Sequence, residues 1–236
     1  MTAAASAVHL YYADRRGLRE ELTAPLVTDD DRQRLAAGMA ARRRAEYLAG
    51  RALLRYALER YTQRPASSFR IAVADEGRPE CVGGPKISLA HSGNVVVCAV
   101  TERDAVGVDV ETRGPRTAIA GIAERYFTPA EAEWVAADPD ARFRMLWVLK
   151  EAYLKALGVG LKGGLASLEC RIEPPRIVAR AADGAAPRLA LWSGRDCHVG
   201  VAVTDAPSVT VVAQRWAVAD ETDTIGPLQP IAASAG

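Results

Sequence analysis

A repeated pattern constrains the fold of this chain more than any other feature. The segment VVVCAVTERDAVGVDV at 95–110 matches HVGVAVTDAPSVTVVA at 198–213, and each has a hydrophobic strand, a threonine, an acidic turn and a second valine-rich strand. The segment GRALLRYAL at 50–58 likewise matches KEAYLKALG at 150–158. The offsets are 103 and 100 residues and the order is the same, so we predict two similar halves fused in one chain.

The elements expected around these repeats indicate an α+β fold. Alternating or valine-rich runs predict strands at 8–12, 69–74, 86–90, 95–101, 106–111, 165–172, 177–179, 187–192, 197–204 and 209–218. N-cap residues and helical spacing predict helices at 29–64, from 128 onward and at 141–157. We expect the strand at 106–111 to pair with the strand at 95–101 across a turn at 102–104.

The repeat also predicts the domain boundaries. We expect an N-terminal α+β half at 1–105 and a C-terminal α+β half at 106–219, each a helix with an antiparallel sheet. A pseudo-twofold axis would relate the halves and leave a cleft between them, where binding sites are common. Residues 220–236 are predicted to form a disordered tail.

The stretch VGVDVE at 106–111 carries two acids on one face of an expected strand. Side chains alternate along a strand, so the valines point one way and Gly107, Asp109 and Glu111 the other. The second copy has Val212 and Gln214 in place of the two acids, so folding does not require them. We therefore expect the acids to bind something positive, and Gly107 to leave room for a ligand.

These carboxylates suit a hard cation. Two acids at i and i+2 can reach one ion, and oxygen ligands without nearby His or Cys favour Mg²⁺ or Mn²⁺ over zinc. On the expected helix at 141–157, Glu151 and Lys155 lie on one stripe. They either form an i,i+4 pair worth about 0.2–0.5 kcal/mol, or provide a third metal ligand or general base and a phosphate contact.

Basic residues are concentrated in one part of a chain whose net charge is only +1. Between residues 32 and 64 there are nine arginines against Glu46 and Glu59, a local charge of +7. This segment is either a solvated helix face or the contact for an anionic ligand or partner. A loop at 88–94 places His91 beside a serine and a glycine, which together can cradle a phosphate. Arg78 lies in a tight turn at 77–80.

Several classes of protein are disfavoured. The net charge argues against a nucleic-acid binder, and no run reaches the 18 apolar residues of a membrane helix. The four cysteines lack CxxC spacing, which predicts buried free thiols in a reducing compartment. The N-terminus does not resemble a signal peptide, so we expect a cytoplasmic protein. Phosphate-loop, dinucleotide, zinc-protease and serine-hydrolase motifs are missing from the sequence.

Five motifs in order carry a resemblance to a known family: GRPE, HSG, GVDVE, FTPAEAEW and WVLKEAYLKALGVGL. Their order and spacing resemble the 4′-phosphopantetheinyl transferase superfamily, and within it the larger Sfp-type enzymes. The resemblance covers residues 40–165 best. It implies a fold of two α+β halves about a pseudo-twofold axis, in agreement with the repeat.

The resemblance also implies a reaction: the 4′-phosphopantetheine arm of coenzyme A moves to a serine of an apo acyl or peptidyl carrier protein, releasing adenosine 3′,5′-bisphosphate. Asp109, Glu111 and Glu151 would hold Mg²⁺ on the pyrophosphate, and Glu151 would be the base for the serine. Lys155 would neutralise the pyrophosphate and assist the leaving group. The phosphates of the nucleotide end would be contacted by residues from the basic segment and the loops, namely Arg42, Arg51, Arg78 and His91.

The chain departs from the family pattern at Ala90, which replaces a serine and is expected to remove one hydroxyl from the phosphate site. Alternatives to the transferase are a Mg²⁺-dependent phosphodiesterase or phosphatase that uses the same acids, and a binding module that has lost catalysis. The sequence does not select among fatty-acid, polyketide and nonribosomal-peptide carriers, nor among Arg42, Arg43 and Arg44 for the coenzyme A contact. The resemblance implies a monomer.

Overall fold

The structure, a computed structural model, describes residues 6–35, 39–74, 77–114, 119–204, 206–216 and 225–234. The strands of these residues are β1 (Ser6–Asp14), β2 (Ile71–Val73), β3 (Pro79–Cys81), β4 (Lys86–Ser92), β5 (Val95–Thr101), β6 (Val106–Thr112), β7 (Leu168–Glu173), β8 (Arg176–Ala181), β9 (Arg188–Ser193), β10 (Cys197–Val203), β11 (Val209–Arg215) and β12 (Gln229–Ser234). The α-helices are α1 (Glu20–Thr23), α2 (Asp29–Gln33), α3 (Ala41–Thr62), α4 (Ile119–Tyr126), α5 (Pro129–Ala136) and α6 (Pro139–Leu157). The prediction of an α+β fold is confirmed.

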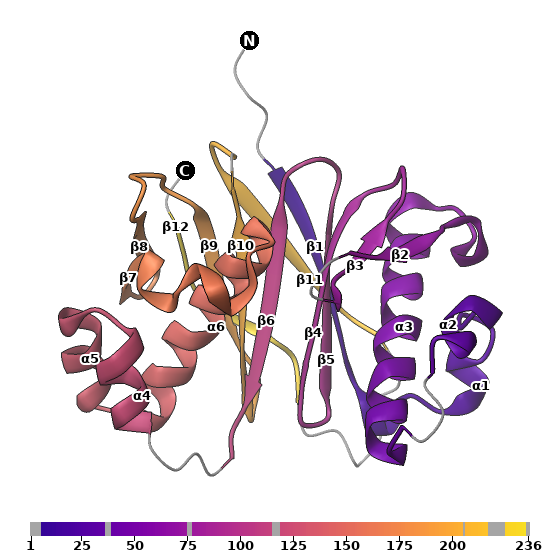
Figure 1. The fold of residues 1–236 in the computed structure, drawn as a ribbon, viewed down its shortest axis with the longest axis horizontal. Coiled ribbons are helices and arrows are strands. Elements are labelled where there is room, and N and C mark those ends of the chain that lie inside the picture. Colours follow the sequence, from indigo (N-terminus) through magenta and orange to yellow (C-terminus); the bar gives the residue numbers. More distant parts are fainter. Residues whose placement is uncertain are drawn as a thin grey trace.

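Two sheets enclose a valine-rich core. One sheet has the order β11-β1-β5-β4 and the other the order β6-β10-β9-β12-β8-β7, while β2 and β3 form a separate ribbon. Buried side chains such as Val97, Val108 and Val201 join the two sheets in one hydrophobic cluster. The long helix α3 covers the four-stranded sheet and α6, with α4 and α5, covers the six-stranded one (Figure 1). Each half therefore has its long helix on the outer face of its sheet.

The chain crosses between the sheets three times, from β5 to β6, from β10 to β11 and from β11 to β12. The strand β5 pairs with β1 and β4, so neither of its edges is left for β6, which pairs with β10 instead. The predicted hairpin across 102–104 is therefore wrong. The same crossing recurs in reverse, since β10 lies in the six-stranded sheet and β11 pairs in parallel with β1. The predicted half at 106–219 is thus wrong for β11, which completes the sheet of the other half.

The segment near the C-terminus is ordered where the structure describes it. Strand β12 pairs with β9 and β8, and Ile225 and Leu228 are buried in the core between the sheets. The prediction of a disordered tail is wrong for residues 225–234 because these apolar side chains have a core to enter. Residues 220–224 and 235–236 lie outside the described residues.

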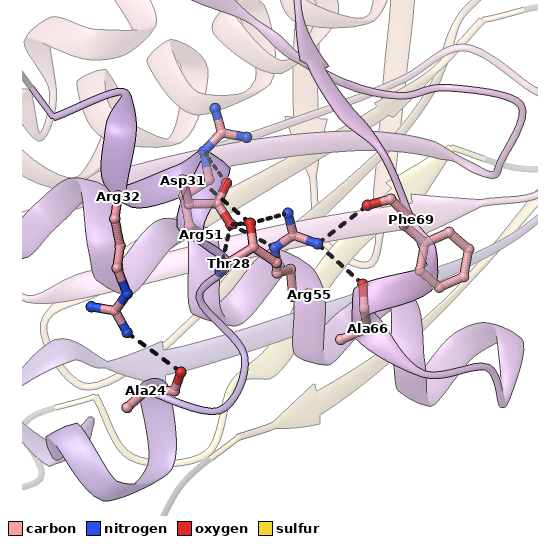
Figure 2. Close-up of polar contacts among 8 residues, drawn as sticks. All are labelled: Ala24, Thr28, Asp31, Arg32, Arg51, Arg55, Ala66 and Phe69. Atoms are coloured by element: carbon pink, nitrogen blue, oxygen red, sulfur yellow. Dashed lines mark hydrogen bonds and ion pairs between the residues drawn. The ribbon is translucent and has the colours of Figure 1, made fainter.

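The predicted helix at 29–64 is two helices joined by a buried ion cluster. Helix α2 begins with a capping box in which Thr28 and Asp31 exchange hydrogen bonds. Arg55 of α3 donates its Nε to Asp31 Oδ2 at 2.6 Å, and its other nitrogens donate to Thr28 and to the carbonyls of Ala66 and Phe69 (Figure 2). Arg51 lies on the same acid, Nε to Oδ1 3.7 Å. These two arginines of the basic segment are buried against Asp31, so they do not belong to a solvated face.

The second half has a similar arrangement, with its capping box 100 residues after the first. Thr128 and Glu131 form the capping box of α5. The buried Lys150 of α6 lies 2.8 Å from Glu131 Oε1 and also donates to the carbonyls of Leu165 and Leu168. In both halves a capping-box acid thus holds a buried cation of the long helix, and that cation binds the turn that follows the helix. This is local evidence for the predicted duplication.

The cysteines agree with their prediction. All four are free thiols in the structure; Cys98, Cys170 and Cys197 are buried and Cys81 is partly buried. In the described part of the chain, no helix is both long and apolar enough to cross a membrane.

Candidate active site

Two glycines bring α6 against the sheet. A Cβ atom on Gly107 would lie 1.8 Å from the Ala152 carbonyl oxygen and 2.6 Å from the Ala156 nitrogen. One on Gly200, in the neighbouring strand β10, would lie 2.4 Å from the Val148 carbonyl oxygen. The expectation that Gly107 leaves room for a ligand is therefore wrong, because the space is filled by the helix backbone. This close approach sets the position of the charged side chains of α6.

Three acids and one lysine meet where α6 crosses β6. The Nζ atom of Lys155 lies 2.6 Å from Asp109 Oδ1. Lys155 therefore pairs across the helix–strand contact with Asp109, and no Glu151–Lys155 bond is found among the ion pairs of the described residues. Glu151 lies within electrostatic range of Asp109, Lys155 and Glu111. The structure thus places together the three acids that the sequence singled out, with one ammonium among them.

The electrostatics of this group favour added positive charge. Burial raises the pKa of Glu151, the charge of Asp109 raises it further, and the pull of Lys155 does not offset them. Burial likewise raises the pKa of Asp109 despite the adjacent ammonium. Three carboxyl groups stand against one ammonium, so the site holds more acid than one lysine neutralises, and burial disfavours the charged forms of Asp109 and Glu151.

The donor set fits a hard divalent cation. Three carboxylates from a strand and a helix are the ligand type that Mg²⁺ and Mn²⁺ prefer, with remaining positions left to water and phosphate. Within the described ranges, however, no three such side chains stand together in a geometry ready to hold a metal. Lys155 instead takes up one oxygen of Asp109. The three carboxyl groups are of the type that such an ion prefers, and they lie near one another. Their side chains would have to move to bind it.

Serine side chains join β4 to β6 at this point. Ser88 Oγ accepts from the Val108 amide at 3.0 Å, and Ser92 Oγ accepts from the Thr112 amide at 3.1 Å. Ala90 lies between them, buried in the core. The expectation that Ala90 removes a hydroxyl from the phosphate site is therefore wrong, since this position faces the core. The Val110 amide, midway between the two bonded amides, favours the charged form of Asp109 and so acts to lower its pKa.

A hollow of about 670 Å³ lies between α3, β4 and the start of β3. Arg42, Arg51 and His91, three of the predicted phosphate contacts, line it. Arg43 lines it as well, whereas Arg44 lines a different hollow, which separates the three adjacent arginines. His91 belongs to β4 itself rather than to the expected loop, and its side chain is exposed.

Arg51 is held but not fully paired. Its side chain is buried, packs over the ring of Tyr47 at 5.1 Å, and reaches Asp31 only at 3.7 Å. Its Nη1 atom is buried without a hydrogen-bond partner, as is the hydroxyl of Tyr47. Both residues line the hollow, so two unused donors are available to an anion there.

Arg78 lies apart from the other predicted phosphate contacts. It donates from Nη1 to the Lys155 carbonyl at 3.2 Å and from Nη2 to Glu80 at 2.9 Å. Its neighbours Gly77 and Pro79 line the hollow of the arginines, but Arg78 itself lines a second, smaller one. Arg78 therefore stands at the boundary between the two halves, against the end of the helix that carries Lys155.

Sequence reasoning missed two kinds of residue. One is Asp31, which lies against Arg51. The capping box that begins at Thr28 could have indicated it. His198 lies directly opposite Glu111 in the β10–β6 ladder, is buried, and has an unpartnered Nδ1. Burial, with Arg113 and Arg144 nearby, lowers the pKa of His198 to about 4. No sequence pattern links positions 111 and 198, because the pairing of β6 with β10 was not predicted.

Comparison with known proteins identifies the family. A family model described as the 4′-phosphopantetheinyl transferase superfamily matches residues 105–201, and one described as the 4′-phosphopantetheinyl transferase N-terminal domain matches residues 31–101. The chain is 30% identical over 169 residues to the 4′-phosphopantetheinyl transferase HetI of Nostoc sp., which covers 68% of this chain and 71% of HetI. The chain belongs to the 4′-phosphopantetheinyl transferase family.

Other relatives of this 4′-phosphopantetheinyl transferase family member align over less of their length. Sfp of Bacillus subtilis (strain 168) is 31% identical over 131 residues, or 53% of this chain and 57% of Sfp. The next relatives after HetI are matched over 52% and 58% of their length. Holo-[acyl-carrier-protein] synthase of Thermotoga maritima matches with a TM-score of 0.37 at 24% identity, covering 44% of this chain and 65% of that chain, which is too weak to carry an argument.

These relatives confirm the resemblance read from the motifs. The two matched families account for the segments that carry Arg42, Arg51, Arg78 and His91 and those that carry the acids and Lys155. The phosphodiesterase or phosphatase alternative finds no support among them.

Proposed function

We propose that this chain transfers the 4′-phosphopantetheine arm of coenzyme A to a serine of an apo carrier protein, using Asp109, Glu111 and Glu151 to hold Mg²⁺ or Mn²⁺. The observation that carries the proposal is the meeting of these acids with Lys155. Arg78 links this group to the arginine-lined hollow, because it donates to the Lys155 carbonyl and its neighbours Gly77 and Pro79 line the hollow. One side of this arrangement suits a metal ion, and the other suits the phosphates of a nucleotide. When bound, the metal supplies charge stabilisation for the pyrophosphate.

The residues of the hollow would bind the nucleotide end of coenzyme A. Arg51 offers an unpaired Nη1 on a guanidinium already fixed by Asp31 and by the ring of Tyr47. Because this side chain is buried and held, it loses little freedom on binding a phosphate. Arg42 is bonded to Glu46 through Nε at 2.9 Å, and its other guanidinium nitrogens would face the phosphate, while His91 is exposed on β4.

Glu151 would act as the base. It takes the proton of the carrier serine as the serine oxygen bonds to the phosphorus that bears pantetheine. The bond from that phosphorus to the bridging oxygen breaks, and adenosine 3′,5′-bisphosphate leaves with the new negative charge. Lys155, which already faces a carboxylate at 2.6 Å, would compensate that charge.

The test is transfer itself. The protein is incubated with coenzyme A, Mg²⁺ and an apo carrier protein, and the carrier is weighed by mass spectrometry. We expect a gain equal to one phosphopantetheine group, and its loss on chelation. Carriers of the fatty-acid, polyketide and nonribosomal-peptide types are tried in turn, because the class served is open. An unchanged mass for every carrier would refute the proposal, and hydrolysed coenzyme A without modified carrier would point to a hydrolase.

A further inference from the structure

Ser92, at the end of β4, lies against one of the proposed metal ligands. Its hydroxyl donates to Glu111, with Oγ 3.3 Å from Oε2. The same Oγ atom accepts from the backbone amide of Thr112 at 3.1 Å and lies 3.1 Å from the Thr112 hydroxyl. One hydroxyl of β4 therefore contacts a backbone amide, a second hydroxyl and a carboxyl group of β6, and the carboxyl group is one of the site acids.

The number of bonds that a hydroxyl can make fixes their direction. A serine Oγ donates one proton and accepts at two lone pairs. A charged carboxylate can only accept, and a hydrogen bond to it is about twice as strong as one between neutral groups. All contacts are satisfied when Thr112 donates to Ser92 from both its amide and its hydroxyl, and Ser92 donates to Glu111. In this arrangement the single proton of Ser92 is directed at the acid.

Ser88 provides a comparison four residues earlier on β4. Its Oγ atom accepts from the Val108 amide at 3.0 Å, which is the same kind of link to β6 that Ser92 makes at 3.1 Å. The residue before Val108 is Gly107, whereas at the corresponding place beside Ser92 the chain has Glu111. Both serines therefore tie β4 to β6, and of the two it is Ser92 that also bonds to an acid. The link between the strands does not require that second bond.

We infer that Ser92 is a positioning residue for the metal site and acts through Glu111. The inference rests on the proposed function, in which Glu111 binds Mg²⁺ or Mn²⁺, and it adds a residue that does not itself touch the ion. A hydrogen bond to one oxygen limits the rotation of a carboxylate, so the group loses less freedom when it binds a metal. This restraint matters more for Glu111, which is partly exposed, than for Asp109, which is buried and paired with Lys155.

The test compares the metal affinity of Ser92→Ala with that of Ser88→Ala. Mn²⁺ is titrated into the protein in the presence of coenzyme A, and the free ion is measured by electron paramagnetic resonance. We expect Ser92→Ala to raise the Kd for Mn²⁺ about tenfold, equivalent to about 1.4 kcal/mol. Ser88→Ala should bind Mn²⁺ like the wild type, although both variants lose a link between β4 and β6 and should be similarly destabilised in urea. The Kd for coenzyme A without metal, measured by calorimetry, should change in neither variant.

Two further variants separate the hydroxyl from the fold. Ser92→Thr keeps the hydroxyl and should bind Mn²⁺ more tightly than Ser92→Ala. Thr112→Val removes one donor to Ser92 but keeps the bond to Glu111, so it should bind Mn²⁺ like the wild type. Tighter binding by Thr112→Val would mean that Ser92 had donated to Thr112 instead, and would overturn the inference.

The outcome also distinguishes this inference from the proposed function. Equal Kd values for Mn²⁺ in Ser92→Ala and Ser88→Ala would overturn the role of Ser92 while leaving the transferase intact. A wild type that binds no Mn²⁺ in the presence of coenzyme A would instead refute the proposed metal site, and the role of Ser92 with it.

Discussion

Replacing Gly107 with alanine is expected to destabilise the protein and to misplace the reaction centre. The new Cβ atom would lie 1.8 Å from the Ala152 carbonyl oxygen. Ordinary C···O contacts are no closer than about 3.3 Å, so α6 must move away from β6 by about 1.5 Å. Both opposing atoms belong to the helix backbone and cannot rotate aside. We therefore expect the upper end of overpacking costs, about 3 kcal/mol.

The assay is urea unfolding with a glycine-to-alanine control. Gly121 in α4 has no atom within 4 Å of its would-be Cβ, so Gly121→Ala should be neutral or stabilising by up to about 1 kcal/mol. For a chain of this length, 3 kcal/mol corresponds to a fall in Tm of roughly 6–12 °C. Transfer should fall about 100-fold as well, because displacement by about 1 Å has effects of that size. A Gly107→Ala variant with wild-type stability and only a raised KM for coenzyme A would refute this reasoning.

Three further perturbations test other parts of the structure. Asp109→Asn should abolish transfer with little change in the unfolding midpoint, since only the pair with Lys155 is lost; a fully active variant would remove Asp109 from the metal site. Asp31→Ala should cost about 3–5 kcal/mol in urea unfolding because it leaves Arg55 buried without its acid, and wild-type stability would contradict that role. The pKa of His198 is about 4 when folded and about 6.5 when unfolded, so the unfolded chain binds the proton more tightly. Stability should therefore fall as the pH drops from about 6.5 to about 4, by about 3 kcal/mol from this residue alone; urea unfolding across that range should show a smaller fall for His198→Gln, and parallel curves would exclude this titration.

The site acids could be predicted from the sequence because alternation is local information. One face of β6 carries only valines, so Asp109 and Glu111 had to share the other, and comparison with Val212 and Gln214 showed that folding does not need them. The start of a helix at residue 128 could be predicted for the same reason. In each case a few adjacent residues determine the geometry.

The errors arose where the geometry depends on distant partners. The pairing of β6 with β10 is not encoded in the turn at 102–104, since both alternatives bury the same valines. Gly107 looked like space for a ligand because nothing in its own strand indicates that Ala152 approaches from α6. Position 90 was assigned to the phosphate site by its neighbour His91, although alternation along β4 turns the two side chains to opposite faces.

The pairing of β11 with β1, in the sheet of the other half, affects how the molecule unfolds. Because β11 closes the edge of β1 in the other half, cutting the chain between the two repeats would leave each fragment with an open sheet edge and half of the valine core. The duplicated units are therefore interlocked, and neither retains a complete core without the other. We expect the whole protein to unfold on heating in one cooperative step, even though its sequence contains two similar repeats.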